Sequence, residues 1–277
     1  MKPQRIVAYL LLIALSTPAG AAEARIASHH LIVQLVSEQQ TIAPGQHFTV
    51  AIHFALEPGW HLYWINPGDS GEPPRVQWEL PSGFTAESPE WPAPRRISAS
   101  QFVDYGYEIE LVLLTRLRAP AKATGSADLK ADVRWAVCRE VCISDKAQLA
   151  LTLPVAAKSQ VGPARALFER TRAQLPKPIP SAWRVSAVSA KDSFLMSLRG
   201  GTSPIPFQAD TEPVFFPAEK QQIENAAPQK IFRNGNTLQF ILKKSEQLGN
   251  PPPRLKGVVS FGAGKAFLID ARVAPHE

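Results

Sequence analysis

Apolar and polar residues alternate along much of this 277-residue chain, and a period of two is the pattern of β-strands. In the segment 47–56, HFTVAIHFAL, every second side chain from Phe48 to Phe54 is apolar and falls on one face. The same alternation recurs at 75–80, 127–137 and 147–153. The chain also holds 26 prolines, which divide it into short elements joined by turns. The pattern predicts an all-β fold that begins with a β-sandwich.

The alternation stops once. Apolar residues follow helical spacing from Ala164 to Leu175, and Pro176, Pro178 and Pro180 then end the pattern. We therefore expect a short helix and a stiff, proline-rich linker over 158–180. Strand-like runs return at 183–188, 193–198, 237–242, 255–261 and 266–273, with a turn expected around Asn234-Gly235. They predict a second, smaller β-sandwich over 181–277, without cysteine.

The first 21 residues have the features of a secretory signal peptide. Lys2 and Arg5 precede the apolar run 6–15, and Ala19-Gly20-Ala21 supplies small residues for cleavage after Ala21. No later segment approaches the roughly 20 apolar residues of a membrane span. The mature chain is therefore predicted to be exported, to a bacterial periplasm, without a transmembrane segment, and its first domain is expected over 25–157.

Charge gives little support for nucleic acid as a partner. The formal net charge is +6, and it becomes +4 once Lys2 and Arg5 leave with the signal peptide. No run of five or more Lys and Arg residues follows.

The chain has two cysteines, Cys138 and Cys142. Fully extended, they would lie roughly 13 Å apart between Cα atoms, whereas a disulfide needs about 4.4–6.8 Å. A bonded pair therefore requires a turn at 139–141, for which one helical turn suffices. A disulfide that closes a five-residue loop adds about 2 kcal/mol to the free energy of unfolding, whereas one that closes a 100-residue loop adds about 4.7 kcal/mol. This is a poor structural staple, and three interpretations stay open: a redox pair, a structural bond and a metal site.

Several neighbours are candidates for a site around the cysteines. Glu140 lies between them and is either a solvated turn residue or an influence on the thiols. His61 and Tyr63 stand two apart on one strand face, within the aromatic segment 56–74. That segment fits core packing, a sugar-binding platform or the wall of a reactive site.

A third segment, 100–114, places Phe102, Asp104, Tyr105 and Gly106 just before an apolar strand. A glycine between aromatic residues is typical of a loop that covers a reactive group and moves aside. Ordinary turns have the same composition.

Together, GWHLYWINPGDSGEPP, the YGYE segment with its following strand, and WAVCREVCISDKAQLALTLP resemble the N-terminal periplasmic domain of the DsbD/ScsB family of thiol:disulfide interchange reductases. The resemblance covers Arg25–Pro154. It is closer to the ScsB-like branch, because five residues separate the cysteines in the DsbD type. It implies an immunoglobulin-like β-sandwich whose cysteines cycle between dithiol and disulfide.

The resemblance also implies roles for individual residues. Cys138 and Cys142 match the redox pair, with Cys142 favoured as the cysteine that bonds the target and Cys138 as its resolving partner. His61 and Tyr63 match positions that line the pair. The residues that match the cap are Asp104, Tyr105 and Gly106, with Phe102 and Tyr105 as candidates for the cap aromatic.

The implied partners are a membrane-embedded thiol reductase, which donates electrons from another polypeptide, and periplasmic thioredoxin-like or disulfide isomerase-like proteins. No cofactor is implied, and the second sandwich is expected to serve docking or spacing. One alternative is a copper-tolerance protein that binds Cu(I) through the two thiolates and His61, with His47 and His53 as further candidates. Another is an inert module with a structural disulfide.

Overall fold

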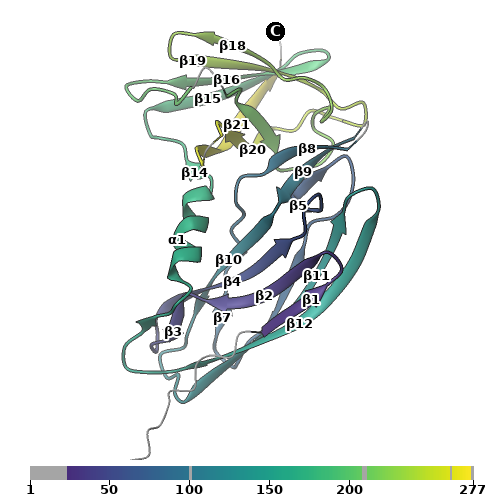
Figure 1. The fold of residues 1–277 in the computed structure, drawn as a ribbon. Helices are drawn as coiled ribbons and strands as arrows, with labels where there is room; N and C mark the ends of the chain where they lie inside the picture. Colours follow the sequence, from purple (N-terminus) through teal and green to yellow (C-terminus); the bar gives the residue numbers. More distant parts are fainter. Residues whose placement is uncertain (1–23, 100–101, 208–210, 263, 276–277) are drawn as a thin grey trace, which may run out of the picture.

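The computed structural model describes residues 24–99, 102–207, 211–262 and 264–275. It consists of two β-sandwiches joined by a helical linker, with the first sandwich below and the second above (Figure 1). The predicted signal peptide, residues 1–21, lies outside the described residues. Within the ranges described, no helix has the length and apolar character needed to cross a bilayer.

Two antiparallel sheets form the first sandwich. The first sheet has the order β1 (Ala24–Ser28), β2 (Leu31–Ser37), β4 (His47–Leu56), β10 (Glu110–Arg118) and β7 (Thr85–Ala86). The second has the order β12 (Cys142–Pro154), β11 (Ser126–Cys138), β5 (His61–Gly68), β9 (Phe102–Glu108) and β8 (Arg95–Ala99), with β6 (Arg75–Glu79) paired to β11. A short pair, β3 (Gln39–Thr41) and β13 (Gln160–Val161), closes one end.

Period-two patterning explains this core. The alternating face of β4 is buried as predicted, because Phe48, Val50, Ile52 and Phe54 are each at most 3% exposed. Phe54 meets Trp135 of β11 edge to face, with 5.7 Å between ring centroids, and so joins the two sheets. The predicted all-β sandwich is confirmed.

The predicted helix forms as α1 (Arg165–Gln174) and covers the outer face of the first sheet. Its fully buried Phe168 packs against Val36, Ala51 and the neighbouring apolar side chains of β10. The proline-rich segment that follows contributes β14 (Lys177–Pro178), which pairs in parallel with β21 (Ala266–Pro275) of the second sandwich.

An ion pair also ties α1 to the first sheet. Arg172 donates two hydrogen bonds of 2.6 Å to the Glu38 carboxylate, which lowers the pKa of Glu38 below its usual value of 4.5. A lowered carboxyl pKa stabilises the folded state above the unfolded-state pKa, and this contribution disappears as the pH falls through the folded-state pKa.

We therefore expect Glu38→Gln to reduce the free energy of unfolding at pH 7 by about 0.2–1 kcal/mol, the range for partly exposed pairs. The difference from the wild type should disappear as the pH falls through the lowered folded-state pKa of Glu38. Urea unfolding at several pH values measures it, and Glu169→Gln, at the exposed pair with Arg165, serves as the control. An unchanged difference at low pH would show that the ion pair is not its cause.

The second sandwich is built on one eight-stranded sheet that folds over its own core. Its order is β17 (Val214–Pro217), β20 (Arg254–Ser260), β21, β15 (Trp183–Ser189), β16 (Ser193–Gly200), β19 (Thr237–Lys243) and β18 (Lys230–Asn234), with β14 on β21. Fully buried Phe194, Phe215 and Phe240 belong to this core. The expected turn is present, because Asn234 pairs with Thr237 and Gly235 has a φ of +56°. The exact boundaries of the predicted domains stay a prediction.

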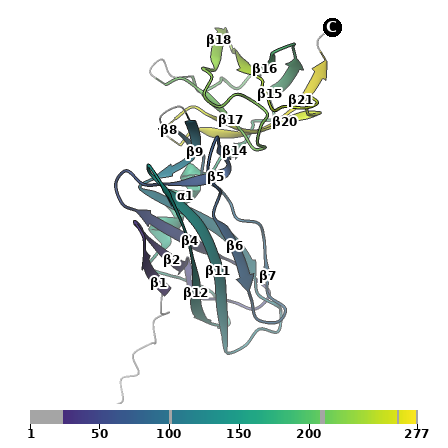
Figure 2. The ribbon, with the colours of Figure 1, turned by 90° about the vertical axis from the view of Figure 1, so that its right-hand side faces the viewer.

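The two sandwiches share apolar contacts where they meet, beside β5, β9 and β20 (Figure 2). Phe216, Val258 and Ala266 of the second sandwich belong to the hydrophobic cluster of the first. Phe216 is 2% exposed, and its ring meets those of Trp64 and Tyr105 edge to face, at 6.3 and 5.1 Å. This packing fixes the second sandwich against the end of β5.

Candidate functional site

The two cysteines face each other at the tip of a long hairpin. Strands β11 and β12 pair from Ser126 with Pro154 to Cys138 with Cys142, and residues 139–141 make the turn. The Cα atoms of the cysteines lie 4.1 Å apart, and their sulfurs are bonded. The predicted turn at 139–141 is confirmed. It is a hairpin turn rather than a helical one, because both cysteines continue the antiparallel ladder.

The two cysteines differ in their exposure. Cys138 is 2% exposed, because its neighbours on β11 and β5 enclose it, whereas Cys142 is exposed. Val141, beside it in the turn, is 64% exposed. An incoming thiolate therefore has access to the Cys142 end of the disulfide.

The hydroxyl of Tyr63 contacts the sulfur of Cys142, the more exposed cysteine of the disulfide. Its ring is fully buried, and its hydroxyl lies 3.5 Å from Cys142 Sγ and 3.4 Å from Ser70 Oγ. Burial is the main cause that raises the pKa of Tyr63, and the charge of Asp104 adds to it, while the Ser70 hydrogen bond opposes the shift. The phenol therefore stays protonated at neutral pH and can donate a hydrogen bond to sulfur.

Gly71 makes room for this ring. It has a φ of +69°, and a Cβ atom there would lie 2.0 Å from Cζ of Tyr63. The glycine of the segment NPGDSG therefore has a steric role at the site, in addition to its role in the turn.

His61 and Asp104 form a buried pair behind the disulfide. His61 lies directly opposite Cys138 in the ladder and is 4% exposed. Its Nε2 atom is 3.7 Å from Asp104 Oδ2 and has no hydrogen-bond partner. The Asp104 carboxylate is 2% exposed and accepts hydrogen bonds from the backbone N–H and the hydroxyl of Ser70, each at 3.0 Å. Sequence reasoning missed Ser70, whose only signal was its place within NPGDSG.

Residues 33–154, less than half of the chain, match the family described as thiol:disulfide interchange protein DsbD, N-terminal. The fold is similar to the crystal structure of the N-terminal periplasmic domain of ScsB from Proteus mirabilis. That likeness has a TM-score of 0.68 at 18% identity and covers 91% of this chain and 98% of that one.

Residues 33–154 form a DsbD/ScsB-like N-terminal domain.

Two further solved structures align with TM-scores of 0.25 or less. Domains 5–6 of the S-layer protein SbsC are 10% identical with a TM-score of 0.23, and cover 92% of this chain and 100% of that one. The tandem Ig repeats of Dlar are 11% identical with a TM-score of 0.25, and cover 90% and 100%. No curated protein sequence matches the chain.

The expected cap of the DsbD/ScsB-like domain needs correction at two residues. Residues 102–108 are strand β9, and Tyr105 points away from the face of Asp104. Tyr105 is fully buried and donates a hydrogen bond of 2.8 Å to Asn225 of the second sandwich. Gly106 packs against β5, since a Cβ there would lie 2.0 Å from Leu62 O. Phe102, 46% exposed on the face of Asp104, stays the candidate for the cap.

The turn between the cysteines carries two charged residues, Arg139 and Glu140. Glu140 is exposed in the turn, as expected of a solvated turn residue. The Arg139 guanidinium lies over the ring of Trp60, 5.4 Å from its centroid, and His30 stacks on the same ring at 3.8 Å. Trp60 and Trp64 belong to the core of the DsbD/ScsB-like domain, in agreement with the core interpretation of the aromatic segment.

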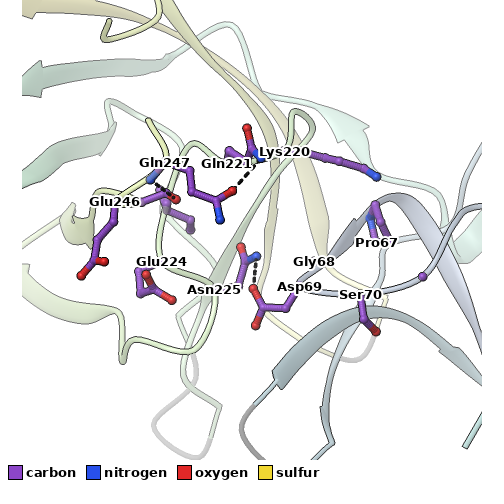
Figure 3. Close-up of a pocket in the computed structure, with 13 residues that line it drawn as sticks. Pro67, Gly68, Asp69, Ser70, Lys220, Gln221, Glu224, Asn225, Glu246 and Gln247 are labelled. Carbon is purple, nitrogen blue, oxygen red and sulfur yellow. Dashed lines mark hydrogen bonds between the residues drawn. The ribbon is translucent and has the colours of Figure 1, made fainter. Parts of the chain in front are cut away.

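Hydrogen bonds to the second sandwich fix the loop 66–71, which carries Ser70. Asn225 donates a hydrogen bond of 2.8 Å to Asp69, and Asn66 donates to Pro217 O and Glu219 O at 2.8 and 3.1 Å. Between the loop and the second sandwich lies a polar cavity of about 440 Å³ (Figure 3). No local pattern in the sequence predicts these contacts, because Asn225 lies more than 150 residues from Asp69.

The candidate copper ligands of the sequence lie on two different sheets, with His47 and His53 on one and His61 and the cysteines on the other. In the part of the chain that the structure describes, no group of three or more His, Cys, Asp and Glu side chains could hold a metal ion. His47 and His53 lie on β4 of the other sheet, beside Glu87 and Glu110 respectively.

Proposed function

We propose that the chain is a thiol-disulfide interchange module that passes two electrons at a time through Cys138 and Cys142. The observation that carries this proposal is the unequal exposure of the two bonded cysteines within a DsbD/ScsB-like domain. A purely structural bond needs no exposed sulfur. An exchange centre needs one sulfur that a partner can reach and one that is held close for resolution.

The exchange proceeds in two balanced steps. A donor thiolate attacks Cys142 Sγ, the bond between the two sulfurs breaks, and Cys138 leaves as a thiolate that takes up a proton. A second donor thiol, on losing its proton, then attacks the donor sulfur of the mixed disulfide and releases Cys142. The donor becomes a disulfide, and the pair becomes a dithiol that reduces a target disulfide by the reverse sequence.

Tyr63 supports the reduced state in this proposal. The Ser70 hydroxyl hydrogen is directed to Asp104, so the Tyr63 hydroxyl hydrogen is available for Ser70 Oγ or Cys142 Sγ. When Cys142 becomes a thiolate, the charge on sulfur makes it the stronger acceptor. Tyr63 therefore lowers the cost of forming the attacking thiolate.

We further propose the setting in which the module works. The signal-like N-terminus supports export to the periplasm, with a membrane-embedded thiol reductase as donor and thioredoxin-like or disulfide isomerase-like proteins as targets. The second sandwich then serves docking or spacing, because its hydrogen bonds to Asn66 and Asp69 fix it beside the loop of Ser70. Phe102 would shield the reduced pair.

A redox titration tests the proposal. We expect the protein, equilibrated in glutathione buffers of graded potential and trapped with a thiol reagent, to change from disulfide to dithiol between about −180 and −300 mV. Mass spectrometry counts the trapped thiols. A pair that stays oxidised throughout this range, with a potential below about −300 mV, would identify a structural disulfide instead.

A further inference from the structure

We propose that His61 is the residue that takes the proton from Cys138 when this cysteine resolves the mixed disulfide, with Asp104 as the group that orients the imidazole. This inference rests on the proposed exchange function and adds a proton acceptor to it. Its grounds are the position of His61 in the sheet and the Nε2 atom, which is buried without a hydrogen-bond partner.

His61 is placed next to the sulfurs by strand register. Cys142, Cys138, His61 and Glu108 are successive partners across β12, β11, β5 and β9, so their side chains emerge from the same face in one row. Cβ atoms of directly opposed residues lie about 4.5–5.5 Å apart. The imidazole is thus a direct neighbour of the buried cysteine, on the side opposite Cys142.

The surroundings of His61 favour a proton acceptor over a packing residue. A buried polar atom normally has a hydrogen-bond partner, yet Nε2 of His61 is buried and has none. The Asp104 carboxylate faces this atom at 3.7 Å. A carboxylate beside Nε2 favours the tautomer with hydrogen on Nε2, which leaves the lone pair of Nδ1 free to accept a proton.

The buried cysteine needs such a neighbour. Cys138 is 2% exposed, and burial in apolar surroundings disfavours the thiolate that must attack. Tyr63 has its hydroxyl at Cys142, and Arg139 is held over Trp60, so neither serves Cys138. The titratable groups around His61 are Tyr63 on β5, Asp104 and the exposed Glu108 on β9, and Cys138 on β11.

With a target sulfur bonded to Cys142, the Cys138 thiol gives its proton to His61, and the thiolate attacks Cys142 Sγ. The bond between Cys138 and Cys142 forms, and the bond to the target sulfur breaks with its electron pair on the target. The imidazolium then returns its proton to solvent or to the leaving thiolate. Two electrons leave the pair, and the target disulfide is reduced.

The test uses the reduced full chain and one equivalent of 4,4′-dithiodipyridine, which releases one thiopyridone when Cys142 attacks it and a second when Cys138 resolves the adduct. For His61→Gln we expect an unchanged first release and a second release slowed by about 10²-fold at pH 7, the lower end for general acid–base catalysis. The difference in second-release rate between the wild type and His61→Gln should become smaller as the pH rises, because hydroxide can then take the Cys138 proton in place of the histidine. Asp104→Asn should slow the second release by a smaller factor, with the same pH dependence.

Two controls make the result specific. His53→Gln removes a histidine that also faces a carboxylate, Glu110 at 3.3 Å, but on the other sheet, and should leave both releases unchanged. Cys138→Ser should give only the first release. If His61→Gln and Asp104→Asn resolve at the wild-type rate, or are slowed equally at every pH, His61 is not the proton acceptor. If the wild type itself gives no second release, the proposed function fails instead.

Discussion

Cys142→Ser is expected to abolish thiol-disulfide exchange, whereas Cys138→Ser is expected to preserve the first step and accumulate a mixed disulfide. The reason is the exposure of the two residues: Cys142 is exposed and Cys138 is 2% exposed. A Cys142 thiolate can attack an external disulfide, but without Cys138 nothing within the chain displaces the bound partner. In the Cys142→Ser variant, the remaining Cys138 is enclosed by its neighbours, so it should react slowly with large external disulfides.

Mass spectrometry of each reduced variant after incubation with glutathione disulfide measures this difference. Cys138→Ser should gain one glutathione in nearly every molecule, and Cys142→Ser almost none at the same time point. The double variant provides the baseline. Equal adducts on the two single variants would remove the assignment of Cys142 as the attacking cysteine. In cells, the Cys138→Ser variant should retain its partner through the same bond and so identify it.

Phe216→Ala should lower the free energy of unfolding by about 3–5 kcal/mol, the usual range for a fully buried phenylalanine. Phe216 is 2% exposed, and its ring fills the space between Trp64 and Tyr105 of the first sandwich. Its loss would leave a cavity where the two sandwiches meet. The hydrogen bonds of Asn66 and Asn225 across the same interface would then have less support from packing.

Guanidinium unfolding followed by tryptophan fluorescence measures the loss, since Trp64 is in direct contact. Phe232→Ala, at a 55% exposed phenylalanine of the second sandwich, is the control and should change the free energy of unfolding by less than about 0.5 kcal/mol. A loss no larger than that of the control would show that the sandwiches are held together without Phe216.

Local patterns predicted much of the fold. The buried face of β4, the helix at Arg165–Gln174 and the turn at Gly235 were all evident in the sequence, because each depends on residues close together in the chain. Strands such as β8 and β17 were missed. β17 pairs with β20, which lies much later in the chain. β8 pairs with the neighbouring β9, but its five residues show too little alternation by themselves.

The site was predictable only in part, for the same physical reason. The cysteines, His61 and Tyr63 come together as expected, but Tyr105 turns toward the second sandwich because β9 continues as a strand through the segment expected to be a loop. Asn225 had no pattern to mark it, and Ser70 had only its place within NPGDSG. Their importance arises from a tertiary contact between two sandwiches, which short-range spacing does not encode.

The hairpin that carries the cysteines also determines what reduction does to the shape of the molecule. The ladder of β11 and β12 holds Cys138 and Cys142 opposite each other through backbone hydrogen bonds below the turn. Opening the sulfur bond frees only the three residues of the turn, so the dithiol and disulfide states should have nearly the same backbone. A partner must therefore distinguish the dithiol state from the disulfide state by the chemistry of the sulfur atoms. Repeated cycles of oxidation and reduction then require no refolding.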